Sequence, residues 1–105
     1  MTTFDRREQA FENQFAHDEE LRFKATARRN KMVGLWAAGK LGLSGAEADS
    51  YALAIVMLDL EHKMDVAEKI KKDFEAKGVA QSDHQIARTM NDLMAQAVID
   101  IKAGR

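Results

Sequence analysis

The stretch 44-SGAEADSYALAIVMLDL-60 carries the strongest fold signal in this chain of 105 residues. Its first four letters have the spacing of a capping box, in which the Ser44 hydroxyl accepts a backbone N–H while the Glu47 side chain returns to the serine amide. The residues that follow are apolar on nearly every side, as in a helix surrounded by other elements. Their large members are Tyr51, Leu53, Ile55, Val56, Leu58 and Leu60. We therefore expect a helix that begins here and is the most buried element of the protein.

Two further helices are predicted on the C-terminal side. The string "DVAE" at residues 65–68 has the capping spacing again and opens a short helix that stops at Gly78. The string "SDHQ" at residues 82–85 opens a longer helix that ends near Gly104. The inward residues of the short helix are Val66, Ile70 and Phe74, with Lys69, Lys71 and Lys72 facing water. Those of the long helix are Ile86, Met90, Leu93, Met94, Ala97, Val98 and Ile101.

A fourth helix is predicted on the N-terminal side, beginning near Asp18. That residue or its neighbours cap the helix, and glycines at 39, 42 and 45 weaken and end it. Its apolar seam is Leu21, Ala25, Met32, Leu35 and Trp36. The chain has no proline, no sustained period-two alternation and no hairpin signal. The predicted fold is therefore all-α, a small four-helix bundle over residues 18–105 joined by short loops.

Residues 1–17 form a separate N-terminal arm, flexible or partly helical. On a helix, Phe11 and Phe15 would lie within about 20° of Phe4, and this aromatic stripe is out of phase with the seam of the next helix. A helix this short is marginal on its own, so the arm needs a surface to order it. We expect the phenylalanines to anchor the arm in a groove of a partner. The alternative is that they pack on the protein's own bundle.

Charge is distributed unevenly, although the net charge is only −1. The first 20 residues contain six acids, Asp5, Glu8, Glu12, Asp18, Glu19 and Glu20. The following stretch contains Arg22, Lys24, Arg28, Arg29 and Lys31 and no acid. Such a cluster is usually a solvated face, but it also suits phosphates or an acidic protein surface. A near-neutral chain argues against a dedicated nucleic-acid binder.

Signals for catalysis or metal binding are weak. There is no cysteine, so a thiol nucleophile is excluded. The glycines of "GLWAAGKLGL", residues 34–43, lack the Walker spacing, and His17, His62 and His84 are scattered rather than paired. We expect no enzyme activity, no metal and no cofactor. No apolar run is long enough to span a bilayer and no secretory pattern opens the chain, so we expect a cytoplasmic protein without direct membrane insertion.

Much of the sequence resembles a known protein family. The string 5-DRREQAFENQFAHDEELRFKATARRNKMVGLWAAGKLGL-43 closely resembles the N-terminal half of the zeta subunit, the inhibitor of alphaproteobacterial F-type ATP synthases. The most specific parts are "FAHDEELRFKATARRNK" and "GLWAA". The similarity continues through "DFEAKGV" and "SDHQIARTMNDLMAQAVIDI", and so covers essentially the whole chain.

The resemblance implies a regulatory inhibitor of ATP hydrolysis that is peripheral at the inner membrane through the ATP synthase and monomeric when free. Its arm would insert into a catalytic interface of the ATPase head, next to the central stalk, while the bundle stays outside as a stop. The matching arm positions are Phe4, Asp5, Arg6, Arg7, Glu8, Phe11, Glu12 and Phe15. Secondary contacts at the mouth would come from Arg28, Arg29 and Lys31.

The sequence differs from the family pattern at two positions, and its residues leave two other functions open. Gln14 stands where a lysine is expected, which bears on inhibitory potency, and Gly39 stands where a glutamate is common, which weakens a helix end. The first alternative function is a small nucleotide- or nucleic-acid-binding helical module that uses Arg28, Arg29, Lys31 and the lysines at 69–72. The second is a general protein-interaction domain.

Overall fold

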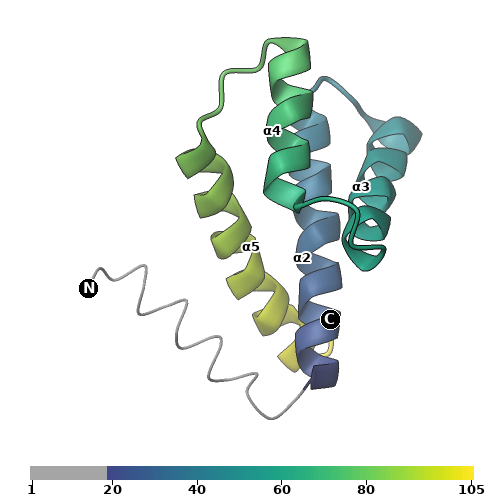
Figure 1. Ribbon diagram of the computed structural model, residues 1–105. Coiled ribbons are helices and arrows are strands. Elements are labelled where there is room, and N and C mark those ends of the chain that lie inside the picture. The colour runs from purple at the N-terminus through teal and green to yellow at the C-terminus, as the bar shows by residue number, and fades with distance from the viewer. Residues whose placement is uncertain (1–18) are drawn as a thin grey trace.

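The computed structural model describes residues 19–105, and the predicted arm and the Asp18 cap lie outside the described residues. The described part contains four helices and no strand, which confirms the all-α prediction (Figure 1). The helices are α2 (Glu19–Lys40), α3 (Gly45–Leu60), α4 (Val66–Lys77) and α5 (Asp83–Lys102).

The long helix α2 is the centre of the bundle. Helices α3 and α5 pack along it on opposite sides, and α4 closes the bundle against α5, α2 and α3 (Figure 1). Trp36 of α2 meets Phe74 of α4 edge to face, with ring centroids 5.6 Å apart. The main core consists of Val33, Ala37, Ile55, Val66, Ile70, Phe74 and Ile86. The inward positions predicted for α4 are therefore confirmed.

The second cluster of the interior is small and joins α2 to α5. Ala25 of α2 packs there against Val98 of α5, with Leu21, Met94 and Ile101 around them. Together with Ile86 and Ala97, which are buried, these residues confirm the apolar stripe predicted for α5. The cluster fixes the start of α2, where the N-terminal segment joins the bundle.

The prediction that residues 44–60 form the most buried element is wrong. Helix α3 buries only Ala52 and Ile55, whereas Leu53 is 62% exposed. The reason is position, because α3 lies at the edge of the bundle and packs chiefly against α2. Gly34 allows this packing, since a Cβ there would lie 2.7 Å from the Ala52 Cα.

The seam predicted for α2 needs one correction. Leu35 is 38% exposed rather than inward, while Ala25 is fully buried. The helix instead buries Asn30, Gly34 and Ala38 along with its apolar positions. A central helix with neighbours on several sides buries a wider arc than a single apolar stripe predicts.

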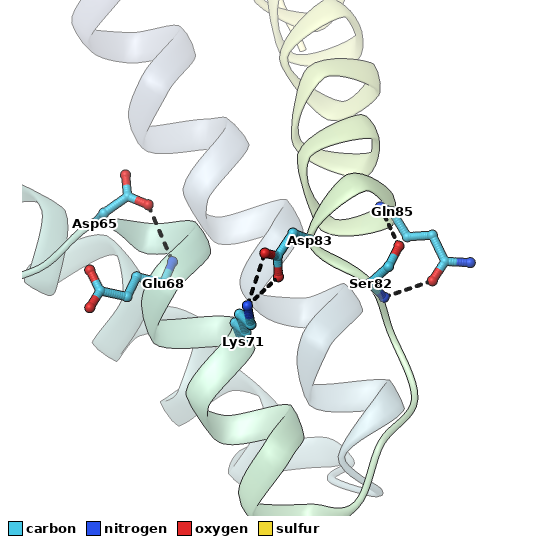
Figure 2. Close-up of polar contacts among 6 residues, drawn as sticks. All are labelled: Asp65, Glu68, Lys71, Ser82, Asp83 and Gln85. Carbon is cyan, nitrogen blue, oxygen red and sulfur yellow. Dashed lines mark hydrogen bonds and ion pairs between the residues drawn. The ribbon is translucent and has the colours of Figure 1, made fainter.

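The helix starts show two caps as predicted and one that differs. Ser82 and Gln85 form the complete capping box of α5, and the Asp65 carboxylate accepts from the Glu68 amide at the start of α4 (Figure 2). Ser44 makes no side-chain bond, so the predicted box of α3 is wrong, although the helix does begin beside it. Gly45 has a φ of +56°, so the first residue of α3 lacks the right-handed helical backbone on which regular cap geometry depends.

All four helices end in the same six-residue turn. In α4 the Gly78 amide donates to the Glu75 carbonyl and the Val79 amide to the Phe74 carbonyl, which is the Schellman pattern around a left-handed glycine. The predicted stop at Gly78 is thus confirmed. The end of α3 uses the same bonds, but its left-handed residue is His62, with a φ of 52°.

Candidate functional site

The eight arm positions, Phe4, Asp5, Arg6, Arg7, Glu8, Phe11, Glu12 and Phe15, lie outside the described residues. Their role therefore stays a prediction. The three secondary positions, Arg28, Arg29 and Lys31, all lie on α2. They are consecutive or nearly so in sequence, yet the fold gives each one a different environment.

Arg28 ties α2 to the C-terminal end of the chain. Its Nη1 donates to the Arg105 carbonyl at 2.6 Å, and its Nη2 lies 3.5 Å from the Asp100 carboxylate. Asp100 is mostly buried, with its side chain 14% exposed, and it also pairs with the Arg105 guanidinium. Arg28 is therefore engaged in holding the fold together and is only partly available to a partner.

Arg29 belongs to a polar network between α2 and α3. Its Nε and Nη2 donate to the Asn30 Oδ1 at 3.2 and 3.0 Å, and the Asn30 amide donates to the Asp59 carboxylate at 2.9 Å. Burial lowers the pKa of the Arg29 guanidinium, and the carboxylates of Asp59 and Asp65 oppose that shift. Asn30 is 1% exposed, and its amide oxygen and its amide nitrogen both form hydrogen bonds, so this network fixes how the two helices lie against each other.

Lys31 is exposed and borders a surface groove between α2 and α3. The groove has a volume of about 620 Å³, with Ala27, Leu53 and Val56 as its apolar lining. Arg28 and Lys31 stand on the α2 side and Asp49 on the α3 side. An apolar floor with charged margins is the arrangement expected of a surface that receives a peptide segment.

The predicted lysines of α4 are each paired with a carboxylate. Lys71 reaches across to Asp83 of α5 at 2.8 Å (Figure 2), and this hydrogen bond raises the pKa of the Lys71 amine. Lys72 lies 3.7 Å from the Glu68 carboxylate. Both lysines face water as predicted.

Lys69 differs from that prediction because it is partly buried. Its Nζ donates to Asp73 at 3.0 Å, and the Tyr51 hydroxyl donates to the other oxygen of the same carboxylate at 2.7 Å. Burial and this bond raise the pKa of the Tyr51 hydroxyl. The positive charge of each of these three lysines is thus offset by a carboxylate of the bundle.

The described residues contain no group of three or more His, Cys, Asp or Glu side chains that could hold a metal ion. His62 and His84 are exposed and far apart in sequence, and His17 lies outside the described residues. No helix between residues 19 and 105 is both long and apolar enough to cross a membrane.

Two features of this surface are missed by sequence reasoning. Asn30 looks like a polar residue within a basic run, but it is the centre of the network between α2 and α3. Leu53 looks like a core residue, but it lines the groove. The sequence does contain a signal for the second feature. Leu53, Met57 and Leu60 recur on one face of α3, and their side chains stay exposed if no other helix covers that face.

Comparisons with known proteins agree with this architecture. A solved structure described as a solution NMR structure of a protein shares 37% sequence identity and a TM-score of 0.69. The match covers 81% of this chain and 99% of the other, which supports the four-helix fold. The comparison with curated proteins finds no match. The model of one protein family, ATPase inhibitor subunit zeta, matches residues 1–100 of this chain. On that match, which takes in the N-terminal segment as well as the bundle, the chain belongs to the ATPase inhibitor subunit zeta family.

Proposed function

We propose that this protein inhibits ATP hydrolysis by the F-type ATP synthase by inserting its N-terminal arm into a catalytic interface of the ATPase head. The observation that carries the proposal is the family match over residues 1–100, because it includes all eight predicted arm positions. The family is one of non-enzymatic regulators, which agrees with the prediction that this chain is not an enzyme.

The arm has the composition of a helix-in-groove ligand. Phe4, Phe11 and Phe15 supply large apolar anchors at helical spacing, and the charges between them, from Asp5 to Glu12, set register and steer the encounter. Aromatic anchors in the centre of an interface usually carry most of its binding free energy. Gln14 lies between two of these anchors, so it bears on potency rather than on the mode of binding.

The bundle acts outside the cleft as a stop beside the central stalk. Arg28 and Arg29 hold contacts within the fold, so Lys31 is the member of the predicted secondary set that can change partners without loss of stability. We expect the protein to act as a monomer in the cytoplasm, at the inner membrane only through its ATP synthase partner. The pairing of Lys69, Lys71 and Lys72 with carboxylates does not favour the nucleic-acid alternative.

The test is ATP hydrolysis by the F-type ATPase of the same organism, stripped of its own inhibitor and titrated with this protein. Full-length protein should inhibit, and a variant with Phe11→Ala and Phe15→Ala should bind more weakly by about 2 kcal/mol or more, a factor of about thirty. Ile99→Ala is the matched control, because Ile99 is a large apolar residue that is 53% exposed on α5 rather than in the arm.

Two outcomes separate the mechanism from its alternatives. Inhibition that survives deletion of residues 1–17, with an unchanged far-ultraviolet circular dichroism spectrum for the bundle, would show that the arm is not the inhibitory element. Binding of RNA or nucleotide at physiological salt without any effect on the ATPase would favour the nucleic-acid alternative.

A further inference from the structure

Exposed apolar side chains gather on α2 and α3. The described part of the chain has six large apolar side chains that are exposed, and five of them belong to these two helices. Leu53, Met57 and Leu60 recur at i, i+4 and i+7 on one face of α3, with exposures of 62%, 43% and 42%. A contiguous set of this kind on a small protein marks a binding surface.

Helix α2 contributes the other side of this surface. Ala27, Lys31 and Leu35 follow one another at intervals of four residues, so they lie on one side of α2. Ala27 and Lys31 line the groove together with Leu53, and Leu35 is 38% exposed. We define the α2–α3 face as Lys31 and Leu35 of α2 together with Leu53, Met57 and Leu60 of α3.

The charges beside the α2–α3 face are unequal. Arg28 and Lys31 line the α2 side of the groove, and Asp49 is the acid on the α3 side. The Asp100 carboxylate lies 3.5 Å from the Arg28 guanidinium, whereas Lys31 is exposed and forms no ion pair within residues 19–105. The Lys31 ammonium group is thus available to an acidic residue of a partner. The segment that fits is a helix with an apolar side whose flank toward α2 is acidic.

The size of the face limits what it can hold. Leu53 and Leu60 are about 10 Å apart along α3, and packed helices lie about 8–10 Å apart. The face therefore covers on the order of a few hundred Å², whereas a stable complex buries about 800 Å² on each partner. It is too small to hold two copies of the chain together by itself. It is large enough to add to a contact made elsewhere on the same partner.

We propose that the α2–α3 face docks on the catalytic head of the F-type ATP synthase, against an apolar helix with an acidic flank. This proposal rests on the proposed function and gives the bundle a contact of its own beside that of the arm. The chain belongs to a family of ATPase inhibitors, and Lys31, one of the secondary positions implied by the family resemblance, is part of the face. The occupant is thus a second surface of the same partner.

The position of the face in the chain favours this partner. Helix α2 begins at Glu19, immediately after the N-terminal segment, and Lys31 lies about 18 Å further along the helix. An arm bound to the head holds the face within reach of the head, at an effective concentration of about a millimolar. A contact that is weak by itself then raises the overall affinity, chiefly because it slows dissociation.

Cysteine protection in the full-length protein tests the proposal. The chain has no cysteine, so Leu53→Cys and Ile99→Cys each supply a single thiol. Both native side chains are exposed, Leu53 on α3 and Ile99 on α5, which packs on the other side of α2 (Figure 1). Saturating F-type ATPase, stripped of its own inhibitor, should slow the reaction of Leu53→Cys with a maleimide by about tenfold or more. The reaction of Ile99→Cys should keep its rate, and the mass of the small protein reports both reactions.

Variants of the face should weaken inhibition without lowering its maximum. Leu53→Glu should raise the concentration for half-maximal inhibition about tenfold, because burial of an exposed leucine contributes a free energy of that order. Lys31→Glu should slow association, and its effect should shrink as salt is raised. Ile99→Glu and Arg88→Glu are the matched controls, since both positions are exposed on α5, and each should change that concentration by less than about twofold.

The outcomes separate this proposal from the proposed function. Inhibition by the unmodified protein, with both thiols reacting equally with and without ATPase, would overturn the docking and leave the inhibition in place. Protection of Leu53→Cys without any inhibition would support the docking and overturn the proposed function. Protection of Leu53→Cys in concentrated protein without ATPase would assign the face to a second copy of the chain and overturn the proposal. Failure to bind the ATPase at all would overturn both.

Discussion

Helices α2 and α3 lie side by side but differ in how much of themselves they bury. Helix α2 is rich in charged residues and buries six positions, whereas α3 is rich in apolar residues and buries two. Helix α2 has α3, α4 and α5 around it, while α3 packs chiefly on α2. Burial thus follows the number of neighbours, and the apolar surplus of α3 becomes a surface.

Small residues explain how α2 serves several neighbours. Ala25, Gly34, Ala37 and Ala38 are buried in α2, and short side chains let adjacent helices approach closely. The charged side chains of α2 lie on the parts of its surface that do not pack against a neighbouring helix. A central helix can therefore carry many charged residues and still form the middle of the bundle.

The largest effect expected within this comparison comes from Ile55→Ala. Ile55 is the large side chain of α3 that is fully buried, so its removal should cost about 3 kcal/mol of unfolding free energy. Leu53→Ala, two residues away but exposed, should change stability by less than about 0.5 kcal/mol. Urea unfolding followed by Trp36 fluorescence measures both. Equal losses would mean that both faces of α3 are covered.

Gly34→Ala tests the close approach of the two helices. The new Cβ would lie 2.7 Å from the Ala52 backbone, so the helices must move apart at a cost of about 1–3 kcal/mol. Gly39→Ala is the control in the same helix, because nothing lies within 4 Å of a Cβ there. That control should stabilise the protein by up to about 1 kcal/mol in thermal unfolding. Destabilisation by Gly39→Ala would contradict this account.

Asn30→Ala removes the centre of the polar network between α2 and α3. It leaves Arg29 and Asp59 without their bonds to Asn30, at a cost of about 1–3 kcal/mol in chemical unfolding. Gln96→Ala breaks a similar amide-to-carboxylate bond, to Asp100, but at an exposed position, and should cost far less. A similar cost for both would mean that burial of the network contributes little.

Ser82→Ala and Ser44→Ala separate the two kinds of helix start. Ser82 accepts from the Gln85 amide, so its loss should cost about 1 kcal/mol. Ser44 makes no side-chain cap bond, and its loss should be near zero in the same thermal unfolding measurement. A loss at Ser44 as large as that at Ser82 would revive the capping box that the sequence predicts for α3.

The smallest expected effect is a gain from His62→Gly. His62 is a non-glycine residue in the left-handed conformation at the end of α3, where α4 has Gly78. Relief of that conformation, less the added entropy of the unfolded chain, should stabilise the protein by about 0.5 kcal/mol. Calorimetry measures this gain. Gly78→Ala is the opposite change at the end of α4, and it should destabilise the protein.

Local signals were sufficient for the helices and for most of their ends. The capping residues Asp65 and Ser82 and the glycine at 78 act on backbone groups within four residues, so their effect is present in the sequence itself. The failure at Ser44 has a local cause that capping spacing does not contain, because Gly45 adopts a positive φ. Spacing describes which residues can bond, and the backbone dihedrals decide whether they do.

The candidate site was less predictable than the fold. The basic run at residues 28–31 reads as one cluster, but adjacent helical residues point in directions about 100° apart. Arg28 therefore meets the C-terminal end, Arg29 meets the α2–α3 network and Lys31 meets water. Charge alone did not indicate which of these residues would be used inside the fold.

The sequence by itself determined four helices, most of their limits and the inward stripes of α4 and α5. These properties depend on contacts within a few residues and on helical periodicity. Only the tertiary structure decided that α2 is central, that α3 leaves Leu53 exposed and that Asn30 is buried. Those outcomes depend on which helices are neighbours, and the same apolar face is core or surface according to whether another helix covers it.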